Sequence, residues 1–478
     1  MPSDWQVNEG TNLGNGTWTV QTSDLSSLTV LTAAAYAGAM VLNVTETWTT
    51  ANGSVGTATI ADNVEAYAPG MPIFALAGND TLTSAGANDL FVFAQPIGTD
   101  TIYNFNTATD KIDLVGFTHV ASFSDLSIAT DGSGDAVITV GPGETITLHG
   151  INAASLTAAD FVFNQKPTIE NAGSMVVSHG AVLPLSGTIS NTGTITLDSS
   201  GDQTELHIIG EGVTLEGGGR VTLSGEAVIV GTSAASTLVN IDNTICGAGR
   251  ICAGDGTLTL INHTHGTMDA NIAGGTLILD TGMTITNDGV LEATNGGTVQ
   301  IFDTVTGSGS AIVQGGTLIF EAQSNLNVMF NNGPNGTTYG ELVLRDGSGF
   351  SGQISGFSGT APDLAHSDAI DLAGMSYNSS GFSESYNAAT GMLRVTDGNH
   401  FATLTFNSFG GTFSFASDGH GGVLITDPPA VGPSSSVSIG GPGHDTFVFH
   451  PAYAAIDSTG AYAFNLPFVI SRTWAPRP

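Results

Sequence analysis

Positive charge and cysteine are both scarce in this chain of 478 residues. It holds eight lysine and arginine residues against 42 aspartate and glutamate residues, for a formal net charge of −34, and it has two cysteines. Two cysteines cannot build a disulfide scaffold. Nucleic acids and anionic membrane surfaces are bound through Lys and Arg, so the charge balance argues against both as partners. Self-repulsion on this scale destabilises a compact state unless cations screen or bind the chain.

Long hydrophobic runs are also missing. The apolar stretch at residues 28–42 is too short, and too often interrupted by Thr and Gly, to cross a membrane. The first ten residues, "MPSDWQVNEG", contain neither a basic nor an apolar region, so no cleavable signal peptide is expected. We therefore expect no membrane insertion, and export would need a different route.

Common catalytic motifs are missing too. The chain has no H-E-x-x-H motif, no G-x-S-x-G elbow and no lysine in a phosphate-binding glycine loop. Between residues 167 and 345 the cations are Arg220, Arg250 and Arg345. We therefore predict that the protein is not an enzyme. The alternative is a β-helical polysaccharide lyase or epimerase, which would need a base and a cation beside clustered carboxylates.

Residues typical of strands and turns are abundant. Glycine contributes 65 residues, whereas charged residues make up 10 per cent of the chain. This composition favours strands and turns over helices, so we predict an all-β fold. Residues 1–68 alternate apolar and polar side chains, which predicts a partial immunoglobulin-like β-sandwich module.

Short aliphatic strands such as "GTLTLI", "GTLILD" and "GTLIF" recur between residues 167 and 345 at intervals of about twenty residues. Turns rich in Gly, Asn and Asp separate them, which predicts a central parallel β-helix of about eight or nine coils. Residues 346–427 predict a second β module, because "DAIDLAGM" matches the earlier "DKIDLVGF" and "DGHGGVLIT" matches "DGSGDAVIT". Residues 428–478 read as a linker, one nonapeptide and an irregular tail.

The nonapeptide "GGPGHDTFV" fits the pattern G-G-x-G-x-D-x-U-x of calcium-binding repeats. Its defined positions are Gly440, Gly441, Gly443, Asp445 and Phe447. The glycines permit a sharp turn that exposes backbone carbonyls, and the aspartate adds a carboxylate. Ca²⁺ takes six to eight oxygen ligands, which two facing turns can supply and one cannot.

These repeats resemble the RTX family of secreted calcium-binding proteins of Gram-negative bacteria. The resemblance rests on "GGPGHDTFV", on the degenerate pair "AGNDTLTSA" and "GANDLFVF", and on "DKIDL", which is similar to a segment of serralysin-type C-terminal domains. It implies an RTX-like β-roll and C-terminal-type module at residues 69–166, calcium-triggered folding outside the cell, and type I secretion directed by an uncleaved C-terminal signal. It further implies the C-terminal portion of a large adhesin, whose partner would be a surface polysaccharide or a cell-surface receptor.

The candidate calcium ligands combine the nonapeptide, the degenerate pair and three aspartates that follow it. Beyond the residues of the nonapeptide, they are Gly78, Asn79, Asp80, Gly86, Asn88, Asp89, Asp100, Asp110 and Asp113. Asp80 and Asp89 could instead be turn residues whose side chains accept backbone N–H groups. Asp100, Asp110 and Asp113 could likewise be capping acceptors.

Two further pairs of residues are candidates for a metal site and for a disulfide. His263 and His265 are two residues apart on an expected strand, so they could face the same way and bind a metal, or form a solvated face. Cys246 and Cys252 are expected to be small buried residues, with a disulfide across a turn as the alternative.

Overall fold

The computed structural model describes residues 1–23, 28–34, 36–84, 86–427, 455–456 and 462–463. Contacts divide the chain into one unit from Met1 to Pro428 and a second from Pro429 to Pro478. In the second unit, β44 (Ala455–Ile456) pairs antiparallel with β45 (Tyr462–Ala463). The expected calcium-binding nonapeptide, with Gly440, Gly441, Gly443 and Asp445, lies outside the described residues.

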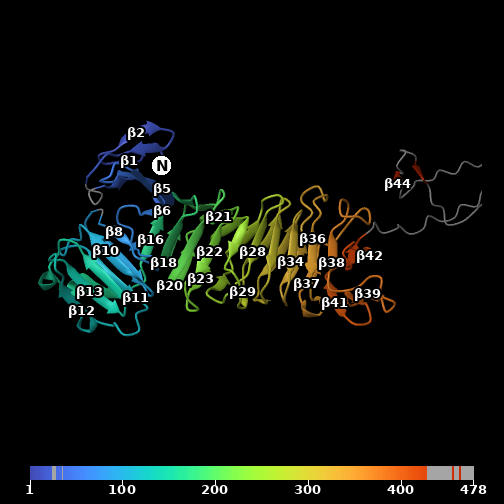
Figure 1. The fold of residues 1–478 in the computed structure, drawn as a ribbon. Helices are drawn as coiled ribbons and strands as arrows, with labels where there is room; N and C mark the ends of the chain where they lie inside the picture. The colour runs from blue at the N-terminus through green and yellow to red at the C-terminus, as the bar shows by residue number, and fades with distance from the viewer. Residues whose placement is uncertain (24–27, 35, 85, 428–454, 457–461, 464–478) are drawn as a thin grey trace, which may run out of the picture. The chain divides into compact units, whose positions relative to one another are not determined.

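A parallel β-solenoid of about 12 turns forms the centre of the first unit, which confirms the predicted all-β fold and parallel β-helix (Figure 1). Most coils contribute one strand to each of three ladders, called faces A, B and C here in the order in which the chain visits them. Each strand pairs with the equivalent strand of the next coil, and both run in the same direction. Every ladder of the solenoid is therefore parallel.

Face A consists of β22 (Val228–Gly231), β25 (Gly249–Ile251), β28 (Thr276–Leu279), β31 (Thr298–Ile301), β34 (Thr317–Phe320), β36 (Glu341–Leu344) and β38 (Ala369–Leu372). Face B consists of β16 (Thr168–Asn171), β23 (Thr237–Asn240), β26 (Thr259–Asn262), β29 (Ile285–Asn287) and β32 (Val305–Thr306). Two long strands, β18 (Val182–Asn191) and β20 (Glu205–Glu216), run from face A into face B.

Face C consists of β17 (Ser174–Ser178), β19 (Thr194–Asp198), β21 (Arg220–Ser224), β24 (Thr244–Gly247), β27 (Thr267–Ala270), β30 (Val290–Thr294), β33 (Ser310–Gln314), β35 (Asn327–Phe330) and β37 (Gln353–Ser355). The solenoid has more coils than the eight or nine expected. Two coils cross face B through single bridges, Val305 to Ser324 and Ser324 to Phe350, so their sequences lack a recognisable strand there.

Aliphatic side chains stacked in register fill the solenoid. Leu277, Val299, Leu318 and Leu342 follow one another on successive strands of face A, and each is fully buried. The alternating buried and partly exposed positions of these strands match the two-residue period of a strand with one covered face. At one corner, Gly282 has a φ of +71°, a conformation that side chains disfavour.

A ladder of buried asparagines lines the corner between faces B and C. Asn240 donates to Asn262 at 2.9 Å, and Asn262 donates to Asn287 at 2.7 Å. Asn171 donates to Asn191 of the next coil in the same way, and Asn191 donates to Asn243, which shares a turn with Asn240. In the sequence, this ladder is visible only as turns such as "NTG" and "NDG". These turns do not show that the asparagine side chains are buried and contact one another.

A smaller roll precedes the solenoid. One parallel sheet holds β7 (Ile73–Phe74), β9 (Leu90–Ala94), β11 (Lys111–Val115) and β15 (Phe161–Phe163). The other holds β8 (Thr81–Thr83), β10 (Thr99–Tyr103) and β14 (Glu144–Leu148) in parallel, followed by the antiparallel strands β13 (Ala136–Gly141) and β12 (Ser127–Thr130). From β7 to β11 the chain alternates between the two sheets and encloses its own hydrophobic core.

Short 3₁₀ helices connect some of the strands. In the described part of the chain they are Phe123–Asp125, Ala153–Ser155, Ala158–Asp160 and Gly347–Gly349. Among the described residues, no helix is long and apolar enough to span a membrane.

The two ends of the first unit differ from the modules expected there. Near the N-terminus, β1 (Gln6–Val7) pairs with β4 (Val30–Leu31), and β2 (Thr11–Gly14) pairs with β3 (Thr17–Thr19). The hairpin of β5 (Ala37–Thr49) and β6 (Val55–Ala66) extends face C, since β5 pairs with β17, instead of forming a second sandwich sheet. The expected second module contributes β37 and β38 to the solenoid.

The remaining strands of that second module form antiparallel pairs at the end of the solenoid. They are β39 (Ser383–Asn387), β40 (Met392–Thr396), β41 (Phe401–Phe406), β42 (Ser414–Ser417) and β43 (Val423–Thr426). The strand β43 runs antiparallel to β38, so it covers the last edge of face A.

Candidate functional site

The roll brings the predicted calcium ligands together in two pairs, one at each edge. At the first edge, the turns that lead into β8 and β10 stack on each other. The backbone N–H of Asp80 donates to Oδ1 of Asp100 at 2.8 Å, and the backbone N–H of Thr99 donates to Oδ1 of Asn79 at 2.8 Å. A side chain at Gly98 would collide with the carbonyl of Gly78, so this contact requires glycine.

The second edge pairs Asp89 with Asp110. The backbone N–H of Asp89 donates to Oδ1 of Asp110 at 3.2 Å, while Oδ2 of Asp89 accepts from Ser84 and from the N–H of Gly86. Asn88 precedes the aspartate with a φ of +68°, as asparagine in a tight turn does. Both carboxylates therefore act as acceptors that close their turns, which is the alternative interpretation of these aspartates.

The first edge differs because it holds buried charge that is not fully satisfied. Asp100 is 0% exposed, and its Oδ2 has no hydrogen-bond partner among the described residues. Burial raises the pKa of Asp100 to about 7, and the neighbouring charge of Asp80 contributes to the rise. Burial also raises the pKa of Asp80, although the N–H of Leu76 that donates to its Oδ2 opposes this effect.

Glu65 adds a third carboxylate near the first edge. Burial, together with the nearby charge of Asp80, raises the pKa of Glu65 to about 8. Asn63 and Tyr67, which flank it on the hairpin, donate to its two carboxylate oxygens at 2.8 and 3.2 Å. The sequence gives no signal for Glu65, because a single glutamate in an alternating strand looks like an exposed position.

Asp113 lies at neither edge. It sits within β11 beside Val92, where its Oδ1 accepts the N–H of Gln165 at 3.3 Å. Its Oδ2 is buried without a hydrogen-bond partner in the described chain, and burial raises the pKa of Asp113 to about 6. The structure thus separates Asp113 from the aspartates with which it was grouped.

A cation fits the first edge better than the second. Across the part of the chain that the structure describes, no group of three or more His, Cys, Asp or Glu side chains is arranged to hold a metal. Ca²⁺, however, also accepts backbone carbonyl oxygens, so a site can need fewer carboxylates. The unpartnered Oδ2 of Asp100, together with Asp80, is an oxygen arrangement that suits a hard cation.

The structure places the other two candidate pairs in a turn and among buried residues. His263 and His265 lie exposed in the turn between β26 and β27, so the expected strand is wrong at these residues. The strand ends at Asn262 because the buried asparagine ladder turns the chain there. Cys246 and Cys252 are buried free thiols and form no disulfide.

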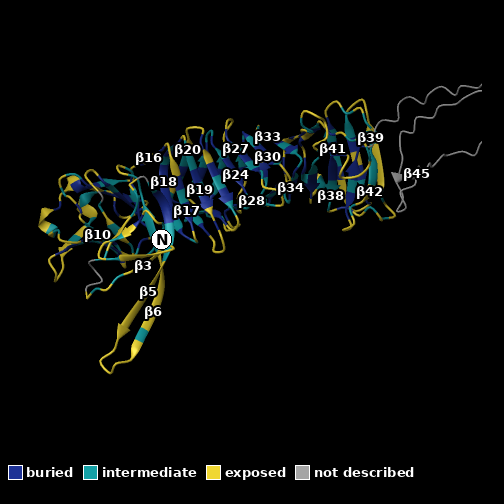
Figure 2. Cartoon of the chain, turned by 90° about the horizontal axis from the view of Figure 1, so that it is seen from above, coloured by how far each residue is buried: buried dark blue, intermediate teal, exposed yellow. Residues whose placement is uncertain are grey.

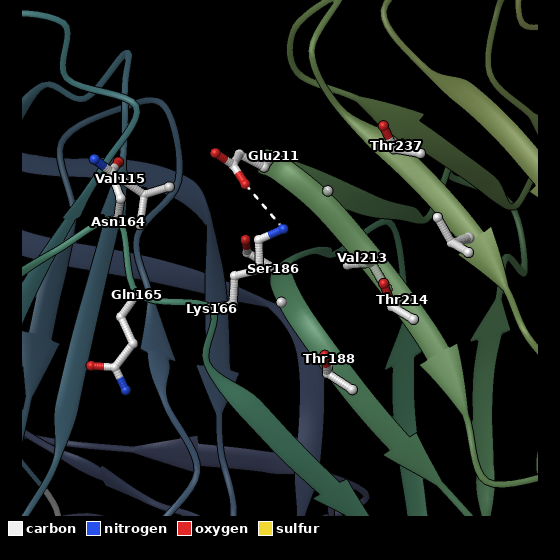
Figure 3. A pocket seen from close by; sticks show the side chains of 13 residues that line it. Val115, Asn164, Gln165, Lys166, Ser186, Thr188, Glu211, Val213, Thr214 and Thr237 are labelled. Carbon is white, nitrogen blue, oxygen red and sulfur yellow. Dashed lines mark ion pairs between the residues drawn. The ribbon is translucent and has the colours of Figure 1, made fainter.

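A groove of about 250 Å³ lies where the segment after β15 meets the first coils of the solenoid (Figure 3). Asn164, Gln165 and Lys166 line it on one side, and Thr188, Glu211 and Thr214 on the other. The ammonium group of Lys166 and the carboxylate of Glu211 are 3.2 Å apart. Hydroxyl, amide and charged groups in this groove can form hydrogen bonds with a polar ligand.

A scan against protein-family models and a search of curated proteins each found no match to this chain.

Proposed function

We propose that this chain is a non-enzymatic, calcium-stabilised adhesin or matrix protein that acts outside the cell. The observation that carries the proposal is the first edge of the roll, where Asp100 is buried with one oxygen unpartnered beside Asp80. A bound cation would satisfy that oxygen and offset the repulsion between the two carboxylates. The formal net charge of −34 favours cation binding in the same direction.

Calcium is the cation that this setting favours. Asp80 and Asp100 would hold it through carboxylate oxygens, and the backbone carbonyl of Gly78, which lies beside Gly98, would be a further ligand. Extracellular calcium-binding modules bind with dissociation constants of about 10⁻⁴ to 10⁻³ M, a range that the cytosol does not reach. The proposal therefore includes export, and the resemblance to RTX proteins supports a type I route in a Gram-negative bacterium.

The adhesive partner in this proposal is a surface polysaccharide or a cell-surface receptor. The groove at Lys166 and Glu211 supports a saccharide, because its threonine hydroxyls and side-chain amides can both donate and accept hydrogen bonds. The remaining solenoid surface provides further polar rows, such as Thr276, Thr298 and Thr317 on face A.

Equilibrium dialysis tests the calcium proposal directly. We expect the chain to retain calcium at millimolar concentration in 0.15 M NaCl, with Mg²⁺ displacing it poorly because Mg²⁺ demands a more rigid octahedral shell. The double variant Asp80→Asn/Asp100→Asn should lose at least half of the retained calcium. The matched variant Asp202→Asn, at an exposed position, should not. No retained calcium at millimolar concentration would contradict the proposal.

Incubation with acidic polysaccharides tests the non-enzymatic part. We expect alginate and pectin to yield no unsaturated products above a boiled control, with or without calcium. Two solenoid arginines, Arg250 and Arg345, are paired with Asp280 and Glu321, so they are engaged in ion pairs. Calcium-dependent release of unsaturated sugars, monitored by their absorbance at about 235 nm, would establish the lyase alternative. Loss of this sugar release in the variant Arg250→Gln or Arg345→Gln would identify which arginine supplies the positive charge for the reaction.

A further inference from the structure

The strands β39, β40 and β41 form a three-stranded antiparallel sheet at the end of the solenoid (Figure 2). One side of this sheet packs into the hydrophobic core, where Leu393, Val395 and Leu404 are buried. The other side is called the outer face here, and it holds a hollow of about 460 Å³. That volume lies within the range of about 300–1,000 Å³ that is typical of small-molecule sites. The hollow is separate from the groove at Lys166 and Glu211.

The register of the three strands determines which side chains line the hollow. Opposed residues of an antiparallel pair share a face. Two rows of paired residues, with one residue from each strand, therefore lie side by side on the outer face. They are Ser385, Arg394 and Thr403 in one row, and Ser383, Thr396 and Phe401 in the other. Arg394 and Phe401 are diagonal neighbours, which places their backbones about 7–8 Å apart.

Arg394 gives the hollow a positive charge in a strongly acidic protein. It is exposed, and it forms no ion pair with another residue that the structure describes. Lys166, Arg250 and Arg345, by contrast, are each paired with a carboxylate. With a formal net charge of −34, the chain has many carboxylates that could have neutralised this arginine. Its guanidinium group is therefore available to an anion from outside the chain.

The other groups in the hollow suit the uncharged part of a ligand. The hydroxyls of Ser385 and Thr403 flank the guanidinium group and form no hydrogen bond with another described residue. Phe401 is 61% exposed, so much of its ring is open to an apolar surface. Glu384 also borders the hollow, but it is in register with the buried Val395, so its side chain leaves the sheet on the opposite side.

We propose that the outer face around Arg394 and Phe401 binds a single acidic sugar residue, such as a uronate, within a saccharide chain. The planar guanidinium group holds the sugar carboxylate through two parallel hydrogen bonds. The apolar C–H face of the pyranose ring packs on Phe401, while the hydroxyls of Ser385 and Thr403 exchange hydrogen bonds with those of the sugar. One guanidinium group matches one carboxylate, and the net charge of −34 repels denser polyanions such as nucleic acids. The inference rests on the proposed role as an adhesin that binds polysaccharide, and it adds the class of sugar.

A matched pair of ligands tests the inference. Methyl β-D-glucuronide and methyl β-D-glucoside share a pyranose ring and differ in a carboxylate against a hydroxymethyl group. In ligand-observed NMR titrations of the full chain, we expect a Kd of about 1 mM for the glucuronide and binding about tenfold weaker for the glucoside. Acetate, which supplies the carboxylate without the ring, should also bind about tenfold more weakly than the glucuronide. Raising NaCl from about 0.15 M to about 0.5 M should weaken glucuronide binding at least twofold, because exposed charges are screened.

Three variants separate the contributions of charge and stacking. Arg394→Gln should weaken glucuronide binding about tenfold and leave glucoside binding unchanged. Arg220→Gln removes the same charge at an exposed position on face C and should bind as the wild type. Phe401→Thr should weaken both ligands about fivefold, since the ring packs on either sugar. All three side chains are exposed, so the melting temperatures should stay close to that of the wild type.

Several results would overturn the inference. Equal weakening by Arg394→Gln and Arg220→Gln would show that binding follows net charge alone. Equal affinity for the glucuronide and the glucoside would remove the carboxylate from recognition, and equal affinity for acetate would remove the sugar. Adhesion to polysaccharide that is unchanged in Arg394→Gln would overturn this site and leave the proposed function standing. Glucuronide binding through Arg394 in a chain that adheres to no polysaccharide would support the site and overturn the proposed function.

Discussion

Millimolar Ca²⁺ should raise the apparent melting temperature of this protein by about 2 °C at pH 8, and Asp100→Asn should remove most of that rise. A ligand that binds only the folded state adds about 1.4 kcal/mol at a tenfold excess over Kd, which millimolar calcium reaches for a Kd of about 10⁻⁴ M. That is a measurable part of a typical net stability of about 5–15 kcal/mol. Asp100 is the centre of the expected effect because its buried Oδ2 has no partner in the described structure.

The same carboxylates predict how stability depends on pH without calcium. The pKa of Asp100 is about 7 in the fold and about 3.9 in an unfolded chain. Between these values the folded state binds the proton more tightly, so the contribution of Asp100 to stability falls as pH rises from about 4 to about 7. Glu65, with a pKa of about 8, extends this loss toward pH 8. Calcium should therefore stabilise more at pH 8 than at pH 5, where protons compete with it.

The variants separate the charge effect from the calcium effect. Without calcium at pH 8, Asp100→Asn should melt above the wild type, because it removes a buried charge. A tenfold change in proton affinity is worth about 1.4 kcal/mol, so we expect a gain of about 2 kcal/mol after the site relaxes. In calcium the order should reverse. Asp202→Asn, an exposed control with the same change in charge, should follow the wild type in both conditions.

Calorimetry with EDTA, CaCl₂ and MgCl₂ at matched ionic strength measures these differences. An equal response to Mg²⁺ would reduce the effect to screening of the acidic surface. A flat response to all three conditions would mean that the aspartates only close their turns, as Asp89 and Asp110 do at the second edge.

Asn262→Leu should lower the free energy of unfolding by about 3–4 kcal/mol, although the two side chains have similar volumes. Asn262 accepts from Asn240 and donates to Asn287 and to the carbonyl of Gly266, and all of these groups are buried. Leucine would leave the Asn240 amide and the Asn287 carbonyl without this partner. Each unsatisfied buried group costs about 1–3 kcal/mol.

Asn325→Leu is the matched control. Asn325 is exposed, and its side chain makes one hydrogen bond of 3.3 Å to the carbonyl of Gly307. We expect it to cost less than about 1 kcal/mol, in line with other surface substitutions. Urea denaturation followed by circular dichroism measures both variants. Hydrogen exchange adds the location, because loss of protection should begin in the coils around β26. Equal destabilisation by the two variants would show that the ladder carries no special stability.

The sequence alone was enough to predict the solenoid. The alternation of aliphatic residues with Thr in segments such as "GTLTLI" and "GTLILD", with Gly, Asn and Asp between them, encodes stacked strands and corners locally. Leu260 and Leu277 are buried where that alternation expects them. Such local signals persist because each coil packs mainly on its immediate neighbours.

The tertiary structure decided which residues form a site. Asp80 and Asp89 are nine residues apart, and in the sequence they look like one pair. Each coil of the roll contains two strands and two turns, so residues nine apart lie at opposite edges, whereas Asp80 meets Asp100 and Asp89 meets Asp110 one full coil later. Glu65 lies near Asp80 because the end of β6 packs beside the roll. The exposure of the β5–β6 hairpin likewise depends on which strands pair with it. Strand register and packing between distant segments set these contacts, and no local pattern of residues encodes them.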